Sequence, residues 1–375
     1  MTRGALDGLT VVDFSRVLAG PYATMLLGDL GARVIKIERP GGGDETRAWA
    51  PPVDATGTST YFASVNRNKE LLEVDLATEG GKAQVRELLA TADIVIENFR
   101  AGTMERLGFG YDAVHELNPR IVYCSITGFG AGEGAALPGF DLLVQAVGGL
   151  MSITGQSPDA PTKTGVAVVD VITGLHALTG ILAALVARQS TGSGQLVEVN
   201  LLSSLLSGLV NQAGAYVGAG VVPNAMGNAH PSIAPYEVFE TADRPLAVAV
   251  GNDGQFRSFA SALGVPELAD DDRFVTNGSR VAHRDELSAL VRARLLTRSA
   301  DEWFALFTAA SVPAGPINTI AEAFELAADL GLEPIVEVAG SRQVANPIRL
   351  SDTPPTYRLA PPIPGDTSPS TGSTP

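Results

Sequence analysis

Cysteine is nearly absent from this chain. Cys124 is the only one among 375 residues, so neither an intrachain disulfide nor a metal site built from several cysteines can form. The histidines also lack the short spacings of zinc ligands; they are His115, His176, His230 and His283. We therefore expect a protein of the reducing cytoplasm with no bound metal.

Positive charge is also scarce. The chain has 26 lysines and arginines against 41 acidic residues, a formal net charge of −15 and a pI of about 4.7. Binding to a nucleic-acid backbone depends on clustered cations, so we expect no nucleic-acid partner, although a few local cations could still bind one small anion. Charged residues make up only 18% of the chain and apolar residues 45%, which indicates much surface hidden within the fold or between subunits, and we expect an oligomer with an extensive interface.

The common nucleotide and hydrolase fingerprints are missing. The first predicted strand-to-helix turn reads SRVLAGP and not G-x-G-x-x-G, and the chain has neither a P-loop nor a G-x-S-x-G elbow. The N-terminus, MTRGALDGLTVVDF, has no continuous apolar segment typical of a signal peptide. The most apolar window, 166–187, includes Asp170 and His176, which favours a buried helix over a membrane span.

Apolar periodicity predicts alternating strands and helices in the first third of the chain. Residues 9–15, 33–40, 69–77, 93–99 and 119–130 read as strands, with helical patterns at 19–32 and 79–92. Strand, helix, strand is the unit of a parallel sheet, so we predict an α/β fold with a large Rossmann-like domain and an open parallel sheet. A helical pattern then runs from about 141 to 187, followed by one more strand and an apolar helix up to 208.

The chain changes character after Gly214. A segment rich in Gly, Pro and Asn leads into a predicted hairpin with its turn at Ala242 and Asp243, and helical stretches follow to about 310. This pattern predicts a smaller α+β domain. The expected boundaries are 1–212 for the first part of the large domain, 213–318 for the small domain and 319–362 for a return segment, with a disordered tail at 363–375.

Basic side chains follow several predicted strands. Arg16, Arg39 and Arg100 come after the first, second and fourth strands, and Lys69 stands at the third. Each taken alone reads as solvated surface charge. Ligands of such sheets bind beyond the carboxyl ends of the strands, so the set as a whole favours a phosphate or pyrophosphate ligand.

Two further features have both a structural and a functional interpretation. Asp141 precedes an apolar helical pattern and could be a helix N-cap, or, flanked by Gly139 and Phe140 with no cation nearby, it could be a nucleophile towards an acyl carbon. The stretch GNDGQF at 251–256 follows a predicted strand. It could be an ordinary turn or a nest of backbone amides that stabilises an oxyanion.

Many blocks in one order resemble the class III CoA transferases, which include formyl-CoA transferase. They include LDGLTVVDFSRVLAGP, NRNKELLEVDL, DIVIENFRAGTMERLGFG, PGFDLLVQAVGGLMSITG, GNAHPSIAPYEVF, AVGNDGQF and VPAGPIN, and the resemblance runs from residue 6 to 362. It implies CoA transfer from an acyl-CoA donor to a small carboxylic acid with no permanently bound cofactor. It also implies an interlocked homodimer, although the end IPGDTSPSTGSTP departs from the family pattern.

The resemblance also implies site residues. In the family an aspartate attacks the donor thioester to give a mixed anhydride, which CoA converts to an aspartyl-CoA thioester, and the aspartate motif falls on Asp141. The glycine loop that covers the intermediates falls on Gly251, Gly254 and Gln255. CoA contacts fall on Arg16, Val17, Arg39, Asn66, Arg67, Asn68, Lys69, Asn98, Phe99, Arg100 and Arg106.

Two other functions compete with transfer. The α-methylacyl-CoA racemases of the same superfamily pair a histidine with an aspartate, and here the histidine position is occupied by Phe140 while the aspartate matches Asp170. One base cannot serve both faces of an α-carbon, so we favour a transferase and interpret Asp170 as structural or as a contact in the site. A protein that binds CoA without turnover is the third alternative. The body of the chain is most similar to members that handle dicarboxylic acyl groups such as succinyl.

Overall fold

The computed structural model describes residues 4–365, which form two compact units. Of these residues, the first unit contains 4–150, 163–222 and 333–365, and the second contains 151–162 and 223–332. The second unit therefore includes a short segment, 151–162, that the sequence analysis placed in the large domain. Most of the expected disordered tail, residues 366–375, lies outside the described residues.

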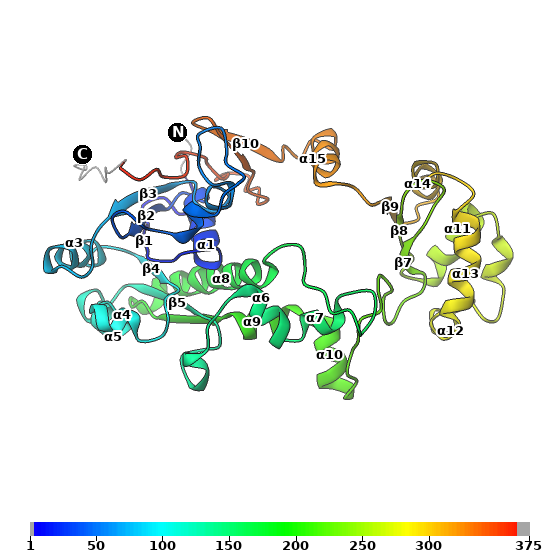
Figure 1. Cartoon of the computed structure of the whole chain (residues 1–375), viewed down its shortest axis with the longest axis horizontal. Helices are drawn as coiled ribbons and strands as arrows, with labels where there is room; N and C mark the ends of the chain where they lie inside the picture. Colours follow the sequence, from blue (N-terminus) through cyan, green and yellow to red (C-terminus); the bar gives the residue numbers. More distant parts are fainter. Residues whose placement is uncertain (1–3, 366–375) are drawn as a thin grey trace. The chain divides into compact units, whose positions relative to one another are not determined.

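A six-stranded parallel sheet forms the centre of the first unit (Figure 1). Its strand order is β3-β2-β1-β4-β5-β6, and every neighbouring pair is parallel. The strand order reverses between β1 and β4, which is the usual ligand position in open sheets of this kind. The predicted α/β fold with an open parallel sheet is confirmed. The strands are β1 Thr10–Asp13, β2 Arg33–Glu38, β3 Lys69–Glu73, β4 Ile94–Glu97, β5 Val122–Thr127 and β6 Leu196–Asn200.

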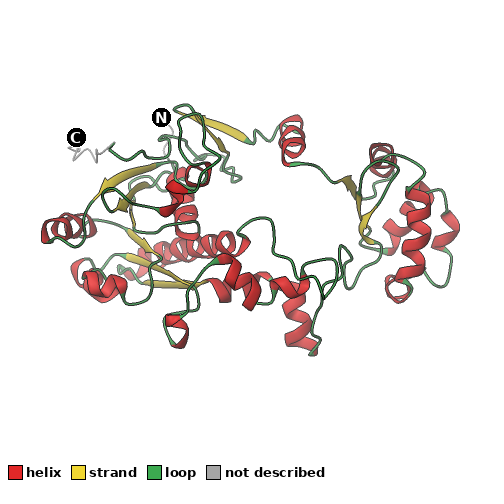
Figure 2. Cartoon of the chain, in the orientation of Figure 1, coloured by secondary structure: helices red, strands yellow, loops and turns green. Residues whose placement is uncertain are grey.

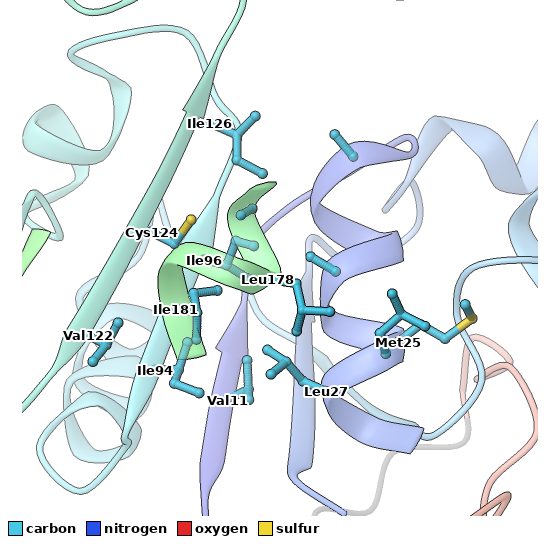
Figure 3. Packing of buried hydrophobic residues seen from close by; sticks show 14 of the residues in the cluster. Val11, Met25, Leu27, Ile94, Ile96, Val122, Cys124, Ile126, Leu178 and Ile181 are labelled. Carbon is cyan, nitrogen blue, oxygen red and sulfur yellow. The ribbon is translucent and has the colours of Figure 1, made fainter. Parts of the chain in front are cut away.

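Each face of this sheet is covered by helices because the buried strands are apolar on both sides. On one face Val11 and its neighbours pack against α1 (Ala19–Asp29) and α8 (Val168–Thr191), as the close view in Figure 3 shows for Leu27, Leu178 and Ile181. The opposite face, which includes Val12, packs against α3 (Glu79–Leu89), α4 (Thr103–Leu107) and α5 (Tyr111–Leu117). Cys124 is buried in the first of these cores.

The expected continuous helical stretch from 141 to 187 is interrupted in the structure. It contains α6 (Asp141–Val147), the short α7 (Leu150–Ile153), a loop and then α8. The loop falls on GQSPDAPTKTG, where glycine and proline disfavour a helix. Within residues 4–365, α8 is the one helix long and apolar enough to cross a membrane by length and composition. Its buried side chains pack against α1 and the sheet, as expected for a core helix.

Shorter elements complete the first unit. They are η1 (Glu45–Ala48), α2 (Thr60–Ala63), η2 (Glu133–Ala136), α9 (Leu201–Gly208), α10 (Val210–Ala219) and the hairpin of β10 (Ile335–Val338) and β11 (Ser341–Val344). The return segment pairs with the N-terminal region through Asn68, whose N–H donates to the carbonyl of Leu359. Sequence-distant segments therefore close this unit.

The second unit combines a small antiparallel sheet with helices, coloured by type in Figure 2. The expected hairpin is present as β7 (Tyr236–Phe239) and β8 (Leu246–Ala249), and β9 (Ala314–Pro316) pairs with β8. Its core contains a group of aromatic side chains, of which Trp303 and Phe307 are stacked with ring centroids 5.5 Å apart. The helices are α11 (Asp253–Ala262), η3 (Pro266–Ala269), α12 (Asn277–Ala282), α13 (Arg284–Leu295), α14 (Ala300–Ala309) and α15 (Ile320–Asp329).

Candidate functional site

A cavity of about 320 Å³ lies in the first unit at the carboxyl ends of β1, β4 and β5. This is the point where the strand order reverses, as expected for an open parallel sheet. Its walls are the turn after β1, the loop after β4, the glycine-rich loop after β5 and the N-terminal ends of α6 and α8. The residues that line it include Arg16, Val17, Asn98, Phe99, Arg100, Gly128, Gly139, Phe140, Asp141 and Asp170.

The turn after β1 is fastened to the loop after β4. The Asn98 side chain accepts a hydrogen bond from the Arg16 N–H at 2.9 Å and donates one to the Arg16 carbonyl at 2.7 Å. The Arg16 guanidinium then lies over the Phe99 ring, 5.0 Å from its centroid, a cation–π distance. The structure therefore brings together four residues that the sequence predicted as CoA contacts, since Val17 lines the same wall.

Val17 adopts a left-handed backbone conformation with φ of 69°. A β-branched residue rarely occupies this region, so the surrounding structure must hold it there. Its N–H donates to both carboxylate oxygens of Asp44, each at 3.3 Å. Asp44 in turn pairs with Lys36 at 3.0 Å, and both side chains are fully buried. The buried ion pair of Lys36 and Asp44 therefore holds the turn after β1, which forms one wall of the cavity.

Asp13 and Lys69 form a second buried ion pair in the same network, 3.1 Å apart. Burial alone would raise the pKa of Asp13, but the positive charges of Lys69 and Lys36 hold this pKa below its usual value. Burial lowers the pKa of Lys69 to about 8 against the opposing effect of Asp13. Lys69 is the first residue of β3 and is 1% exposed, so its interpretation as surface charge at a strand end was wrong.

The side chains of residues 66–69 make hydrogen bonds and ion pairs inside the protein. Arg67 makes a bidentate pair with Asp29 at 2.9 and 2.7 Å, and Asn68 donates to the same carboxylate. The Asn66 side chain donates to the Phe62 carbonyl and accepts from Lys69. The structure does not bring these four side chains to the cavity, and each is at most 2% exposed.

The other predicted arginines lie in three places. Arg100 lines the cavity at the end of the loop after β4. Arg39 lines a neighbouring hollow of about 310 Å³ that shares Arg16 and Phe99 with the first cavity, so the two hollows adjoin around this stacked pair. Arg106 is exposed on α4, donates to Thr103 and lines neither hollow.

Asp141 lies at the N-terminal end of α6 but does not cap it. Phe140 is the N-cap residue, and Asp141 is the first residue of the helix, so the N-cap interpretation was wrong. One carboxylate oxygen, Oδ2, accepts from the N–H groups of Val169 and Asp170 at 2.8 and 3.2 Å. The other, Oδ1, accepts from Gln145. Asp141 therefore accepts from amides at the start of another helix, α8, which have no acceptor within that helix and whose N-cap residue makes no side-chain hydrogen bond.

Asp170 lines the same cavity from the first turn of α8. Burial and, secondarily, the charge of Asp141 raise the pKa of Asp170 to about 7. Among residues 4–365, no hydrogen bond or ion pair to its carboxylate is found. Tyr61 of α2 is close enough for Asp170 and Asp141 to contribute, after burial, to raising its pKa to about 12. The sequence analysis interpreted Asp170 as structural or as a contact in the site and did not propose it as the nucleophile, although VAVVD, an apolar run ending in an acid at a helix start, was a signal for a buried carboxylate.

Close backbone contact builds the wall beside these aspartates. A Cβ on Gly139 would lie 2.6 Å from the Gly128 Cα, and one on Gly128 would lie 2.5 Å from the Gly139 Cα. Any side chain at either position would separate the loop after β5 from the segment leading into α6. Phe140 follows directly and is 60% exposed, at the place where a racemase would need a histidine.

The predicted glycine loop belongs to the second unit. Asn252 caps α11 by accepting from the Gln255 N–H at 2.9 Å, and the Gln255 side chain accepts from the Gly251 N–H at 2.8 Å. The buried guanidinium of Arg280 forms an ion pair of 2.8 Å with Asp253, the residue after Asn252. Two of the loop's amides are therefore occupied, and Gly254 is in the first turn of the helix. No cluster of three potential metal-binding side chains occurs in the described part of the chain.

Comparison with known proteins identifies the family. A model of CoA-transferase family III matches residues 6–368. The succinate–glutarate CoA-transferase of Agrobacterium fabrum is 43% identical over 375 residues, covering 96% of this chain and 93% of the relative. The acetyl-CoA:oxalate CoA-transferase of Acetobacter aceti is 39% identical, with 93% and 90% covered. A crystal structure of a CAIB/BAIF family protein from Brucella suis is 42% identical and covers 97% of both chains with a TM-score of 0.86. The chain therefore belongs to CoA-transferase family III and is a CoA-transferase.

Proposed function

We propose that this enzyme moves CoA from an acyl-CoA donor to a free carboxylic acid through a covalent aspartyl intermediate, and that Asp170 is the aspartate that carries the acyl group. The observation that supports this choice is the contrast between the two carboxylates of the cavity. Both oxygens of Asp141 accept hydrogen bonds from the protein, whereas the Asp170 carboxylate lines the cavity with no partner found in residues 4–365. A nucleophile needs an accessible lone pair, so Asp170 replaces Asp141 in the role expected from the sequence.

The reaction balances with a carboxylate and CoA alone. The Asp170 carboxylate attacks the donor thioester carbonyl, which forms a mixed anhydride and releases CoA thiolate. The thiolate attacks the aspartyl carbonyl, giving an aspartyl-CoA thioester and the free donor acid. The acceptor carboxylate attacks this thioester to form a second anhydride and release the thiolate. Thiolate attack on the acceptor carbonyl then yields the new acyl-CoA and restores Asp170.

The positive groups around the cavity suit the phosphates of CoA. Arg16 and Arg100 line it, Arg39 lines the adjoining hollow, and the stacked Arg16–Phe99 pair lies where the two meet. The buried Nε of Arg16 has no hydrogen-bond partner in the described residues, which leaves a charged donor for an anionic ligand. We propose that Arg16, Val17, Arg39, Asn98, Phe99 and Arg100 contact CoA, while the side chains at 66–69 stabilise the fold.

Other expectations extend this proposal. The relatives act on succinate, glutarate and oxalate, as their names state, so we propose small dicarboxylic acids as substrates. We propose a cytoplasmic homodimer. Its support is the set of apolar side chains that α10 leaves exposed: Val210, Tyr216 and Val217. We further propose that the loop at Gly251 to Gln255 covers the intermediates in the active enzyme, with the Gly254 amide among its donors.

The experiment maps the adduct. The enzyme is incubated with succinyl-CoA, quenched with borohydride, which reduces an aspartyl thioester to an alcohol, and digested for peptide mass analysis. We expect the modified residue at Asp170 and none in Asp170→Asn. A modification at Asp141 would return that residue to the catalytic role, and exchange without any adduct would refute the covalent mechanism. Deuterium uptake at the α-carbon of a 2-methylacyl-CoA would instead indicate a racemase.

A further inference from the structure

Asp141 and Gln145 form a brace between the N-terminal ends of two helices. Asp141 is the first residue of α6, and Gln145 follows one turn later on the same face, where it donates to the Asp141 carboxylate. Gln145 is 1% exposed although its side chain is polar. Its oxygen accepts from the Thr164 N–H at 3.0 Å and from the Thr164 hydroxyl at 3.3 Å. The pair therefore reaches both the loop before α8 and the first turn of α8.

The brace acts on the backbone that carries Asp170. The N–H groups of Val169 and Asp170 are among the unsatisfied donors of the α8 N-terminus, and both donate to Asp141 Oδ2. Without this acceptor those amides would be available to the nearest carboxylate, and Asp170 is in the same turn. A local hydrogen bond of that kind would turn the Asp170 oxygens away from the cavity.

We propose that Asp141 and Gln145 are positioning residues that hold the first turn of α8 so that the Asp170 carboxylate stays free and points into the cavity. The inference rests on the proposed role of Asp170 as acyl carrier. It assigns Asp141 a function distinct from the nucleophilic role expected from the sequence, since Asp141 touches the backbone of Asp170 and not the reacting atoms. Gln145 was not singled out by the sequence.

The electrostatic surroundings of Asp170 agree with this arrangement. Asp141 faces it from α6 and Tyr61 from α2, while Arg16 and Glu45 belong to the wall of the same cavity. The negative charge of Asp141 adds to burial in raising the pKa of Asp170. A more basic carboxylate is a stronger nucleophile once it is ionised, so the brace contributes to reactivity as well as to position.

Two variants separate charge from position. In Asp141→Asn the amide can keep accepting from the two N–H groups, but its NH₂ then meets the NH₂ of Gln145. In Asp141→Asn with Gln145→Glu the new carboxylate accepts from the NH₂ now at position 141 and from Thr164, which restores the hydrogen bonds of position 145 with position 141 and Thr164, loses the long one to the Val166 carbonyl, and moves the negative charge to position 145. Asp112→Asn, an exposed acid on α5, is the matched control.

The measurements are the pH profile of kcat/KM for succinyl-CoA, adduct mapping and thermal unfolding. We expect Asp141→Asn to keep the adduct at Asp170, lose at least about tenfold in kcat/KM and shift the acid limb of the profile to lower pH, because a like charge has been removed. The double variant should regain most of kcat/KM, while the acid limb of its pH profile stays at lower pH than in the wild type. The positioning role would be refuted if Asp141→Asn kept the wild-type kcat/KM and the wild-type acid limb. It would also be refuted if a folded double variant recovered none of the lost kcat/KM. If the adduct of the wild-type enzyme maps to Asp141 and not to Asp170, the proposed function itself would be overturned.

Discussion

The Asp170 N–H donates a hydrogen bond of 3.2 Å to Oδ2 of Asp141, so the backbone of one aspartate binds the side chain of the other. The two residues are 29 positions apart in the chain and lie at the starts of different helices. The two similar acids therefore differ in their contacts. Asp141 accepts hydrogen bonds within the protein, whereas the Asp170 carboxylate has no partner among residues 4–365, and this contrast supports the proposed role of Asp170.

Activity should depend on pH through Asp170. Burial and then the charge of Asp141 raise its pKa to about 7, and only the ionised form is a nucleophile. We therefore expect kcat/KM for the acyl-CoA donor to rise with pH and level off above an apparent pKa near 7. Initial rates between pH 5.5 and 8.5 would measure it, with substrate stability checked in parallel. An acid limb near pH 4 would contradict a buried carboxylate in this role.

Asp170→Asn should abolish exchange and stabilise the fold. The folded-state pKa of Asp170 lies above its ordinary value of 3.8, so ionisation opposes folding, and the penalty grows as pH rises from about 4 to 7. At about 1.36 kcal/mol per pKa unit, removing the charge is worth up to roughly 4 kcal/mol at pH 8 and little at pH 4. Thermal unfolding of both proteins across this range measures the difference. A variant that is no more stable than the wild type at pH 8 would show that ionisation of Asp170 does not oppose folding.

Arg67→Met should weaken the fold more than CoA binding. Arg67 is 2% exposed and pairs with Asp29, so the variant leaves a buried carboxylate that keeps hydrogen bonds from Asn68 and Asn346 but has lost its cation, at a cost of up to about 3–5 kcal/mol. We expect a lower midpoint in urea and an almost unchanged KM for acyl-CoA in the protein that remains folded. Arg86→Met, on the exposed side of α3, is the control. A raised KM with unchanged stability would support the CoA contact expected from the sequence.

Gly139→Ala should disturb the cavity wall. Its Cβ would lie 2.6 Å from the Gly128 Cα, so the backbone of one segment must shift, and overpacking of this kind costs about 1–3 kcal/mol. Because Phe140 and Asp141 follow directly, we expect a loss of kcat as well as of stability. Gly80→Ala, on α3 with no atom within 4 Å, should leave kcat unchanged and stability the same or slightly higher. Equal behaviour of the two variants would mean that the close contact is unimportant.

Local patterns predicted much of the architecture. Apolar runs in strand–helix–strand order indicated the open parallel sheet, and turn residues indicated the hairpin of β7 and β8. The loop between α7 and α8 was not foreseen, although its glycines and prolines were visible. The strand-end residues Arg16, Asn98 and Phe99 were placed correctly because the carboxyl ends of parallel strands share one edge.

Residue type and order in the chain determined the fold class, the family motifs and the edge of the sheet where a ligand belongs, because these depend on interactions within a few residues or on regular strand geometry. Only the tertiary structure decided which polar groups have partners. The sequence alone suggested a surface cation at Lys69 and a CoA contact at Arg67, whereas in the structure these side chains bind Asp13 and Asp29, 56 and 38 residues away. Asp141 similarly reads as the lone acid. The amides that bind it come from a helix that begins 27 residues further along, while the Asp170 carboxylate in the same helix has no partner among residues 4–365.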